Sequence, residues 1–138
     1  MNATLNNLCS VNFAARPAVI IPDGPEVSYE QLWQHVANVA RAMRGNGVQP
    51  GDPIGVVLGN NLEYLVAFLA TTSIRAVAAP LNPGYKVEEF RFYLEDAGAK
   101  AVIVPPGEHP AREAASQLKL PIWECGLEKE GRITFSAG

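Results

Sequence analysis

Residues 54–81 read IGVVLGNNLEYLVAFLATTSIRAVAAPL, and this stretch decides the fold class. Its first run, residues 54–58, is apolar without alternation, which is typical of a strand covered by protein on both faces. Residues 62–74 carry apolar side chains around most of a helix, so this helix should be largely buried. A second apolar run, residues 77–81, follows. A strand, a helix and a strand in this order predict two parallel strands joined by a crossover.

The polar residues of this helix have local structural interpretations. Asn60 or Asn61 is expected to cap its first turn, because asparagine is favoured immediately before a helix. Thr71, Thr72 and Ser73 lie within an apolar helical pattern, and we interpret them as hydroxyls that bond back to backbone carbonyls. They do not form a phosphate-binding loop.

The same alternation continues toward the C-terminus. The predicted elements are a helix over 87–97 closed by Gly98, a strand over 101–104, a helix over 111–118 and a strand over 122–125. Residues 132–135 are a candidate for one more strand. The pattern predicts an α/β fold, a mostly parallel sheet with helices on both faces.

The N-terminal part predicts a β-hairpin and a helix. Two short apolar runs, 18–21 and 27–29, flank a Pro-Asp-Gly-Pro turn, so the hairpin should lie outside the parallel sheet. Ser28 and Gln31 form a capping-box signature, and the helix that follows should end near Gly45. Its apolar stripe consists of Leu32, Val36, Val39, Ala40 and Met43.

Composition limits the function classes. The chain has 138 residues, of which 48% are hydrophobic and 18% charged, as in one globular domain. Its net charge of -3 and the absence of a basic stripe argue against a nucleic-acid partner. Its apolar runs are too short for a membrane span, which needs about 20 residues. Cys9 and Cys125 have no metal-ligand spacing, and two isolated cysteines fit a reducing compartment.

Candidate chemical residues receive structural interpretations. Gly45, Asn46 and Gly47 end a helix, whereas a dinucleotide fingerprint follows a strand and opens one. His35 is interpreted as solvated surface and His109 as turn polarity near a helix start, since neither has a nucleophile in a triad context. The acidic residues of the 87–97 helix form a solvated face; they are Glu88, Glu89, Glu95 and Asp96. We therefore assign no catalytic, cofactor-binding or metal-binding residue in this chain.

Four motifs occur in order and give the chain a family resemblance. They are VSYEQL at 27–32, GVQPGD at 47–52, NNLEY at 60–64 and AAPLNP at 78–83, the last followed by Glu88, Glu89 and Phe90. Over about residues 5–104 this order and spacing resemble the opening of the adenylate-forming superfamily, which includes acyl-CoA synthetases, luciferases and peptide-synthetase adenylation domains. The segment from Arg75 to Leu94 is similar to the oxalyl-CoA synthetase branch, also called peroxisomal-CoA-synthetase-like.

The resemblance implies a two-step reaction. A carboxylate and ATP give an acyl adenylate and pyrophosphate, and the thiol of CoA then displaces AMP. ATP, magnesium and CoA are implied for the parent enzyme. The family's reactive residues lie in a phosphate loop, an aromatic-Thr-Glu motif, a ribose-binding Asp and a C-terminal Lys, and no position here matches them. No cofactor is therefore expected on this chain alone.

The resemblance also sets expectations for the molecule as a whole. Residues 1–138 are expected to be a single, incomplete N-terminal subdomain that acts as a scaffold and is inactive alone. Its partners would be the remaining domains of the ligase, and in isolation a second copy of itself, because apolar area around 54–58 and 62–74 would be exposed. The location would be cytoplasmic or peroxisomal. The alternative is a non-enzymatic module that keeps the fold and binds a protein or an acyl ligand.

Arg75 is a departure from the family pattern, since most members carry Gly there. We expect its guanidinium to cap the last carbonyls of the preceding helix, which makes Arg75→Gly cost stability. The alternative is that it approaches a dianionic substrate in the full enzyme.

Overall fold

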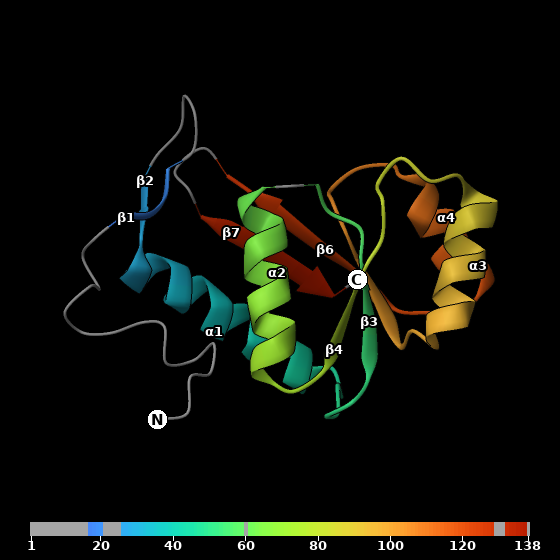
Figure 1. Cartoon of the computed structure of the whole chain (residues 1–138), viewed down its shortest axis with the longest axis horizontal. Helices are drawn as coiled ribbons and strands as arrows, with labels where there is room; N and C mark the ends of the chain where they lie inside the picture. The colour runs from blue at the N-terminus through green and yellow to red at the C-terminus, as the bar shows by residue number, and fades with distance from the viewer. Residues whose placement is uncertain (1–16, 21–25, 60, 129–131, 138) are drawn as a thin grey trace.

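A computed structural model describes residues 17–20, 26–59, 61–128 and 132–137, which form two sheets and four helices (Figure 1). A two-stranded antiparallel hairpin pairs β1 (Pro17–Ile20) with β2 (Glu26–Ser28), apart from the main sheet, as predicted. The turn between them lies outside the described residues. The remaining elements are α1 (Tyr29–Gly45), β3 (Pro53–Val56), α2 (Leu62–Ser73), β4 (Val77–Pro80), α3 (Val87–Ala97), β5 (Ala101–Val104), α4 (Pro110–Gln117), β6 (Ile122–Leu127) and β7 (Ile133–Ala137).

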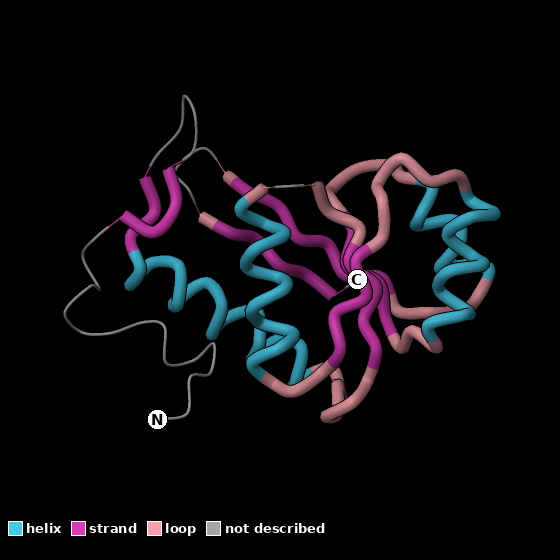
Figure 2. The backbone as a smooth tube through the Cα atoms, in the orientation of Figure 1, coloured by secondary structure: helices cyan, strands magenta, loops and turns pink. Residues whose placement is uncertain are grey.

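The main sheet has the strand order β4-β3-β5-β6-β7. Figure 2 shows its strands in magenta, between the helices on the two sides. The first four strands are parallel, with Ile54 aligned to Ala78 on one side and to Ala101 on the other. This confirms the predicted parallel sheet. β7 pairs antiparallel to β6, with Cys125 opposite Phe135, so the candidate strand near the C-terminus is real and forms the end strand of the sheet beside β6.

Helices cover both faces of the sheet (Figure 1). α1 and α2 pack together on one face, and α3 and α4 pack together on the other. Each face has its own apolar cluster, and β3 contributes to both because successive side chains point to opposite faces. Val56 lies in the α1–α2 cluster and Val57 in the α3–α4 cluster, each almost completely buried.

The expected apolar patch around residues 54–58 and 62–74 is not found. This chain itself covers β3 on both faces, and every residue of α2 is buried or half-buried. The large apolar side chains that the described part of the chain exposes are scattered over other elements; they are Val77, Phe92, Tyr93 and Leu127. The predicted open edge is present within the described part of the chain, where β4 pairs with β3 alone and Val77 on it is 51% exposed.

Local chemistry explains where the helices begin. Ser28 and Gln31 form the predicted capping box of α1, with hydrogen bonds of 3.2 and 3.0 Å. Asn61 caps α2 by accepting a 2.9 Å bond from the Tyr64 amide. The hydroxyl of Thr71 donates to the Ala67 carbonyl at 2.7 Å, and Thr72 and Ser73 bond back in the same way, as predicted.

All four helices end in a Schellman motif, in which a left-handed residue turns the chain and two amides bond back to the last turn. The left-handed residues are Gly47, Arg75, Gly98 and Lys119. At the end of α2, the amide of Ala76 donates to the Thr71 carbonyl at 3.1 Å and that of Arg75 to the Thr72 carbonyl at 3.0 Å.

The expectation for the Arg75 side chain was wrong. The side chain is exposed, and its guanidinium has no hydrogen bond or ion pair within the described residues. The carbonyls at the end of α2 are satisfied by backbone amides instead. Arg75 has φ of 64°, a conformation in which a side chain is strained and glycine is not.

Among the described residues, no helix combines the length and the apolar character that crossing a bilayer requires.

Candidate functional site

The strand order creates a topological switch point, a place where ligands commonly bind in α/β folds. The chain leaves β3 for α2 on one face of the sheet, and it leaves the neighbouring strands β4 and β5 for α3 and α4 on the other face (Figure 1). In open α/β sheets, ligands bind outside the carboxyl ends of strands at such a switch point. The three loops that follow β3, β4 and β5 are therefore the candidate site.

The loop after β4, residues 81–86, contains the end of the AAPLNP motif. The side-chain oxygen of Asn82 accepts the Gly84 amide at 2.8 Å, and the backbone carbonyl of Asn82 accepts the Tyr85 amide at 3.1 Å. Asparagine favours this geometry because its short side chain reaches the backbone two residues on. At the end of the loop, Glu89 accepts the Lys86 amide at 3.0 Å and so closes the first turn of α3.

The loop after β3 leads directly into the N-terminus of α2. Asn61 closes it, since its amide donates to the Gly59 carbonyl at 2.9 Å while its side chain caps the helix. The positive end of the α2 dipole is therefore at the end of the loop after β3. The rest of the NNLEY motif includes Asn60, which lies outside the described residues.

The loop after β5 brings His109 to the site. Its Nδ1 accepts the Ala111 amide at 3.1 Å, so His109 is the cap of α4. Its ring packs on Phe90, with the ring centroids 5.6 Å apart. His109 is half-buried and caps α4, so the interpretation as turn polarity near a helix start is made specific by this cap.

Several influences set the pKa of His109. Burial, the largest, lowers the pKa from the ordinary value of 6.5. The backbone of Pro83 acts on the pKa in the opposite direction, and the positive charge of Arg112 lowers the pKa further. The net result is a lowered pKa, which favours the neutral imidazole.

Arg112 lies at the same edge, between α4 and β6. Its guanidinium donates to the Pro105 carbonyl at 3.1 Å and forms a 3.2 Å ion pair with Glu124. A shallow hollow of about 340 Å³ adjoins this pair and is lined by Gly107, Glu108, Arg112 and Glu124. Because Arg112 already has a carboxylate partner, this pair connects α4 to β6.

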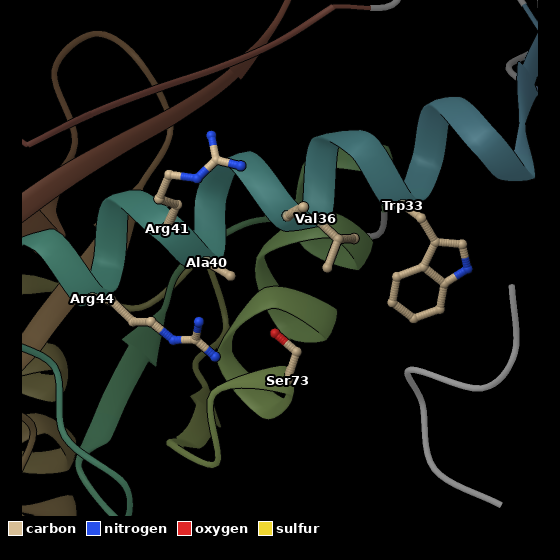
Figure 3. A pocket seen from close by; sticks show the side chains of 7 residues that line it. Trp33, Val36, Ala40, Arg41, Arg44 and Ser73 are labelled. Carbon is tan, nitrogen blue, oxygen red and sulfur yellow. The ribbon is translucent and has the colours of Figure 1, made fainter.

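Two further hollows lie beside α1 and α2, and Figure 3 shows the first of them. The first, of about 290 Å³, is lined by Trp33, Val36, Ala37, Ala40, Arg41, Arg44 and Ser73. The second, of about 420 Å³, shares Arg44 and Ser73 with it and adds Arg75. Arg44 and Arg75 are at the C-terminal ends of α1 and α2, where cations offset the helix dipole. The positive charge of these hollows therefore has a structural explanation.

The other polar residues considered in the sequence do not form a cluster. His35 is half-buried on α1, so the expectation of a solvated position was wrong. On α3, Glu89 caps the helix, and Glu95 pairs with Arg91 at 3.8 Å on the exposed surface. Within the part of the chain that the structure describes, no three His, Cys, Asp or Glu side chains are grouped to hold a metal ion.

Burial keeps Cys125 chemically inert. Its sulfur lies 3.9 Å from the Glu63 carbonyl, and burial, followed by the negative charge of Glu63, raises the pKa of the thiol to about 12. The thiolate, which is the reactive form, is therefore almost absent at neutral pH.

Comparison with known proteins identifies the family. Residues 10–133 match the family described as AMP-binding enzyme, and the chain belongs to that family. Probable CoA ligase CCL9 from Humulus lupulus is 39% identical over 123 residues, which cover 86% of this chain and 23% of that protein. Oxalate--CoA ligase from Arabidopsis thaliana is 34% identical over 122 residues, which cover 87% of this chain and 24% of that protein.

Solved structures agree with the fold. ATP-bound MatB from Rhodopseudomonas palustris superimposes with a TM-score of 0.80 at 26% identity, covering 96% of this chain and 27% of that one. The chain thus spans about a quarter of the length of the relatives that it matches.

Proposed function

We propose that this chain forms the N-terminal subdomain of an ATP-dependent acyl-CoA ligase that uses oxalate as its acid. The observation that carries the proposal is the match of residues 10–133 to the AMP-binding enzyme family, together with 34% identity to an oxalate–CoA ligase. In the proposed reaction, the carboxylate attacks the α-phosphate of ATP and releases pyrophosphate, and the CoA thiolate then displaces AMP from the acyl carbon.

The cofactors of this reaction would be ATP, magnesium and CoA. The described residues do not fit ATP or magnesium, since they contain neither a lysine-bearing phosphate loop nor a cluster of acidic ligands. The chain's proposed role is therefore to position the three loops at the carboxyl edge for the remaining domains. The proposed location is the cytoplasm or the peroxisome.

A chimeric enzyme tests this proposal. The chain replaces the matching segment of the Arabidopsis oxalate–CoA ligase, and AMP release is measured with oxalate, ATP and CoA. We expect activity that depends on all three substrates and falls with a long-chain fatty acid. A folded chimera that activates no acid would contradict the proposal. The isolated chain should give no pyrophosphate exchange, because the groups that stabilise phosphoryl charge are missing from it.

We also propose that the isolated chain self-associates through β4. Among the described residues this strand has one neighbour in the sheet, and Val77 on it is 51% exposed, so this edge is available for pairing. Light scattering at micromolar concentration should show a dimer, and Val77→Lys should return it to a monomer because edge lysines oppose strand pairing. Phe92→Lys on the exposed face of α3 is the matched control and should leave the dimer intact. A monomer at every concentration would refute the proposal.

A further inference from the structure

Helix α3 exposes two neighbouring aromatic side chains at the end of the molecule opposite the hairpin (Figure 1). Phe92 is 63% exposed and Tyr93 is 39% exposed. The helix buries Phe90 and Leu94 in the α3–α4 cluster, and Phe92 lies roughly 200° around the helix from Phe90. An amphipathic helix normally carries a polar or charged residue at such a position. The packing of this chain therefore gives no reason for a phenylalanine there.

The two rings are the exposed end of a continuous line of aromatic side chains. The Phe92 ring meets the Tyr93 ring edge-on, with the centroids 5.2 Å apart, and Tyr93 stacks on Tyr85 at 5.0 Å. Tyr85 in turn contacts the buried ring of Phe90, 5.6 Å away. Because these contacts already hold the rings in place, docking on them costs little side-chain entropy. We call Tyr85, Phe92 and Tyr93 the aromatic patch.

The aromatic patch reaches the candidate site. Tyr85 belongs to the loop after β4, where its amide donates to the Asn82 carbonyl at 3.1 Å. This loop is one of the three at the switch point. A polypeptide that covers the aromatic patch therefore also lies beside a loop of the candidate site.

Exposed acidic side chains flank the aromatic patch on α3. The helix carries four carboxylates and one guanidinium, that of Arg91, which pairs with Glu95 at 3.8 Å. An aromatic centre with a polar rim is typical of a surface that binds another protein segment. The excess of negative charge predicts that the partner surface presents lysine or arginine around an apolar centre.

A second copy of this chain does not suit the aromatic patch. In a two-fold dimer the same surface faces itself, so the carboxylates of α3 would lie against those of the other copy. Like charges that face each other across an interface repel. The edge of β4, which pairs with β3 alone among the described residues, allows self-association without this repulsion.

We propose that the aromatic patch is the docking surface for the part of a CoA ligase that this chain does not span, with Phe92 and Tyr93 as its anchors. The chain spans about a quarter of the length of the ligases that it matches. The inference rests on the proposed function, because the partner is the remainder of such a ligase. Aromatic side chains at the centre of an interface contribute most of the binding energy, which is the role assigned to the two anchors.

Hydroxyl-radical footprinting of the chimeric ligase tests the proposal, with the isolated chain as the matched control. Mass spectrometry gives the modification rates of Phe92 and Tyr93 in both proteins. We expect both rates to be about tenfold lower in the chimera, because the centre of an interface excludes water. Equal rates in the two proteins would overturn the proposal.

The variant Phe92→Lys tests the anchor. In the chimera it should return the modification rate of Tyr93 to that of the isolated chain, because burying an unpaired ammonium group opposes docking. In the isolated chain it should leave the urea midpoint unchanged, since Phe92 is largely exposed there. Phe92→Leu keeps an apolar side chain and should keep Tyr93 protected in the chimera. Protection of Tyr93 in the Phe92→Lys chimera would refute the proposal.

A dilution series tests the second copy as the alternative occupant. In the isolated chain, Phe92 and Tyr93 should be modified at the same rate at every concentration, because pairing through β4 leaves α3 uncovered. Rates that fall as the concentration rises would assign the aromatic patch to a second copy and overturn the proposal.

Co-expression replaces the chimera if the chimera does not fold. The chain is produced together with the remainder of the Arabidopsis oxalate–CoA ligase, and the two should co-purify. Phe92→Lys should raise the dissociation constant at least about tenfold, as expected for an aromatic anchor. Failure to co-purify, or equal dissociation constants for wild type and Phe92→Lys, would refute the proposal.

Failure of the docking surface can be told apart from failure of the ligase function. A chimera that protects Phe92 and Tyr93 but activates no acid would refute the ligase function and leave the docking surface intact. An active chimera in which both residues react as in the isolated chain would refute the docking surface and leave the ligase function intact.

Discussion

Replacing Arg75 by glycine should make the chain more stable, although it removes a charge from a helix end. Arg75 has φ of 64°, and a left-handed conformation costs a residue with a side chain about 1–2 kcal/mol. Glycine avoids this strain but loses about 0.4–1 kcal/mol through the greater freedom of the unfolded chain. The difference leaves a gain of about 1 kcal/mol for glycine over alanine, and about 0–0.7 kcal/mol over arginine once the attraction of its charge to the helix end is subtracted.

Arg75→Ala separates the strain from the charge. Alanine keeps the left-handed strain and removes the guanidinium, whose attraction to the negative end of α2 is worth about 0.3–1 kcal/mol. Arg75→Gly should therefore be about 1 kcal/mol more stable than Arg75→Ala. In thermal unfolding, this corresponds to roughly 4 °C for a domain of this size.

The assay is urea unfolding followed by tryptophan fluorescence, since Trp123 is buried in the core. Gly98→Ala is the reciprocal control, because Gly98 has φ of 65° at the end of α3 and nothing lies within 4 Å of an added Cβ. The Gly98→Ala variant should be about 1 kcal/mol less stable than the wild type, through backbone strain alone. The strain argument fails if Arg75→Gly is less stable than Arg75→Ala while Gly98→Ala behaves as expected.

Two further predictions concern buried positions. Gly126→Ala should cost about 1–3 kcal/mol through overpacking, because a Cβ there would lie 2.7 Å from Pro106 Cγ. Gly45→Ala, with nothing within 4 Å, should be nearly neutral, and equal urea midpoints for the two variants would contradict the steric explanation. In a Cys9→Ser variant, Cys125 should react with a thiol reagent at about pH 8 no faster than the chain unfolds, because the reactive thiolate is almost absent. A rapid reaction of one thiol in the folded chain would show that this site opens.

The sequence alone determined most of the elements of this protein and the class of its sheet. The helix 87–97 and the strand 101–104 were predicted with the bounds that the structure has, because a glycine stop and an apolar run are local signals. The capping box at Ser28 was predicted for the same reason. The parallel direction of the strands followed from the helices between them, since a parallel pair needs a crossover.

The tertiary structure alone decided the features that depend on distant residues. No local sequence signal specifies the strand order or the antiparallel pairing of β7. The burial of β3 on both faces depends on α2 and α3, which cover it from opposite sides of the sheet. His109 followed by proline before an alanine-rich stretch does signal a helix cap, but nothing in its neighbourhood predicts that its ring packs on Phe90. The sequence predicted that the helix before Arg75 would end near it. It did not predict that the arginine itself would adopt a left-handed backbone conformation, because tertiary packing fixes the path of the chain there. Periodicity and capping act over a few residues, whereas such contacts exist only after the chain has folded.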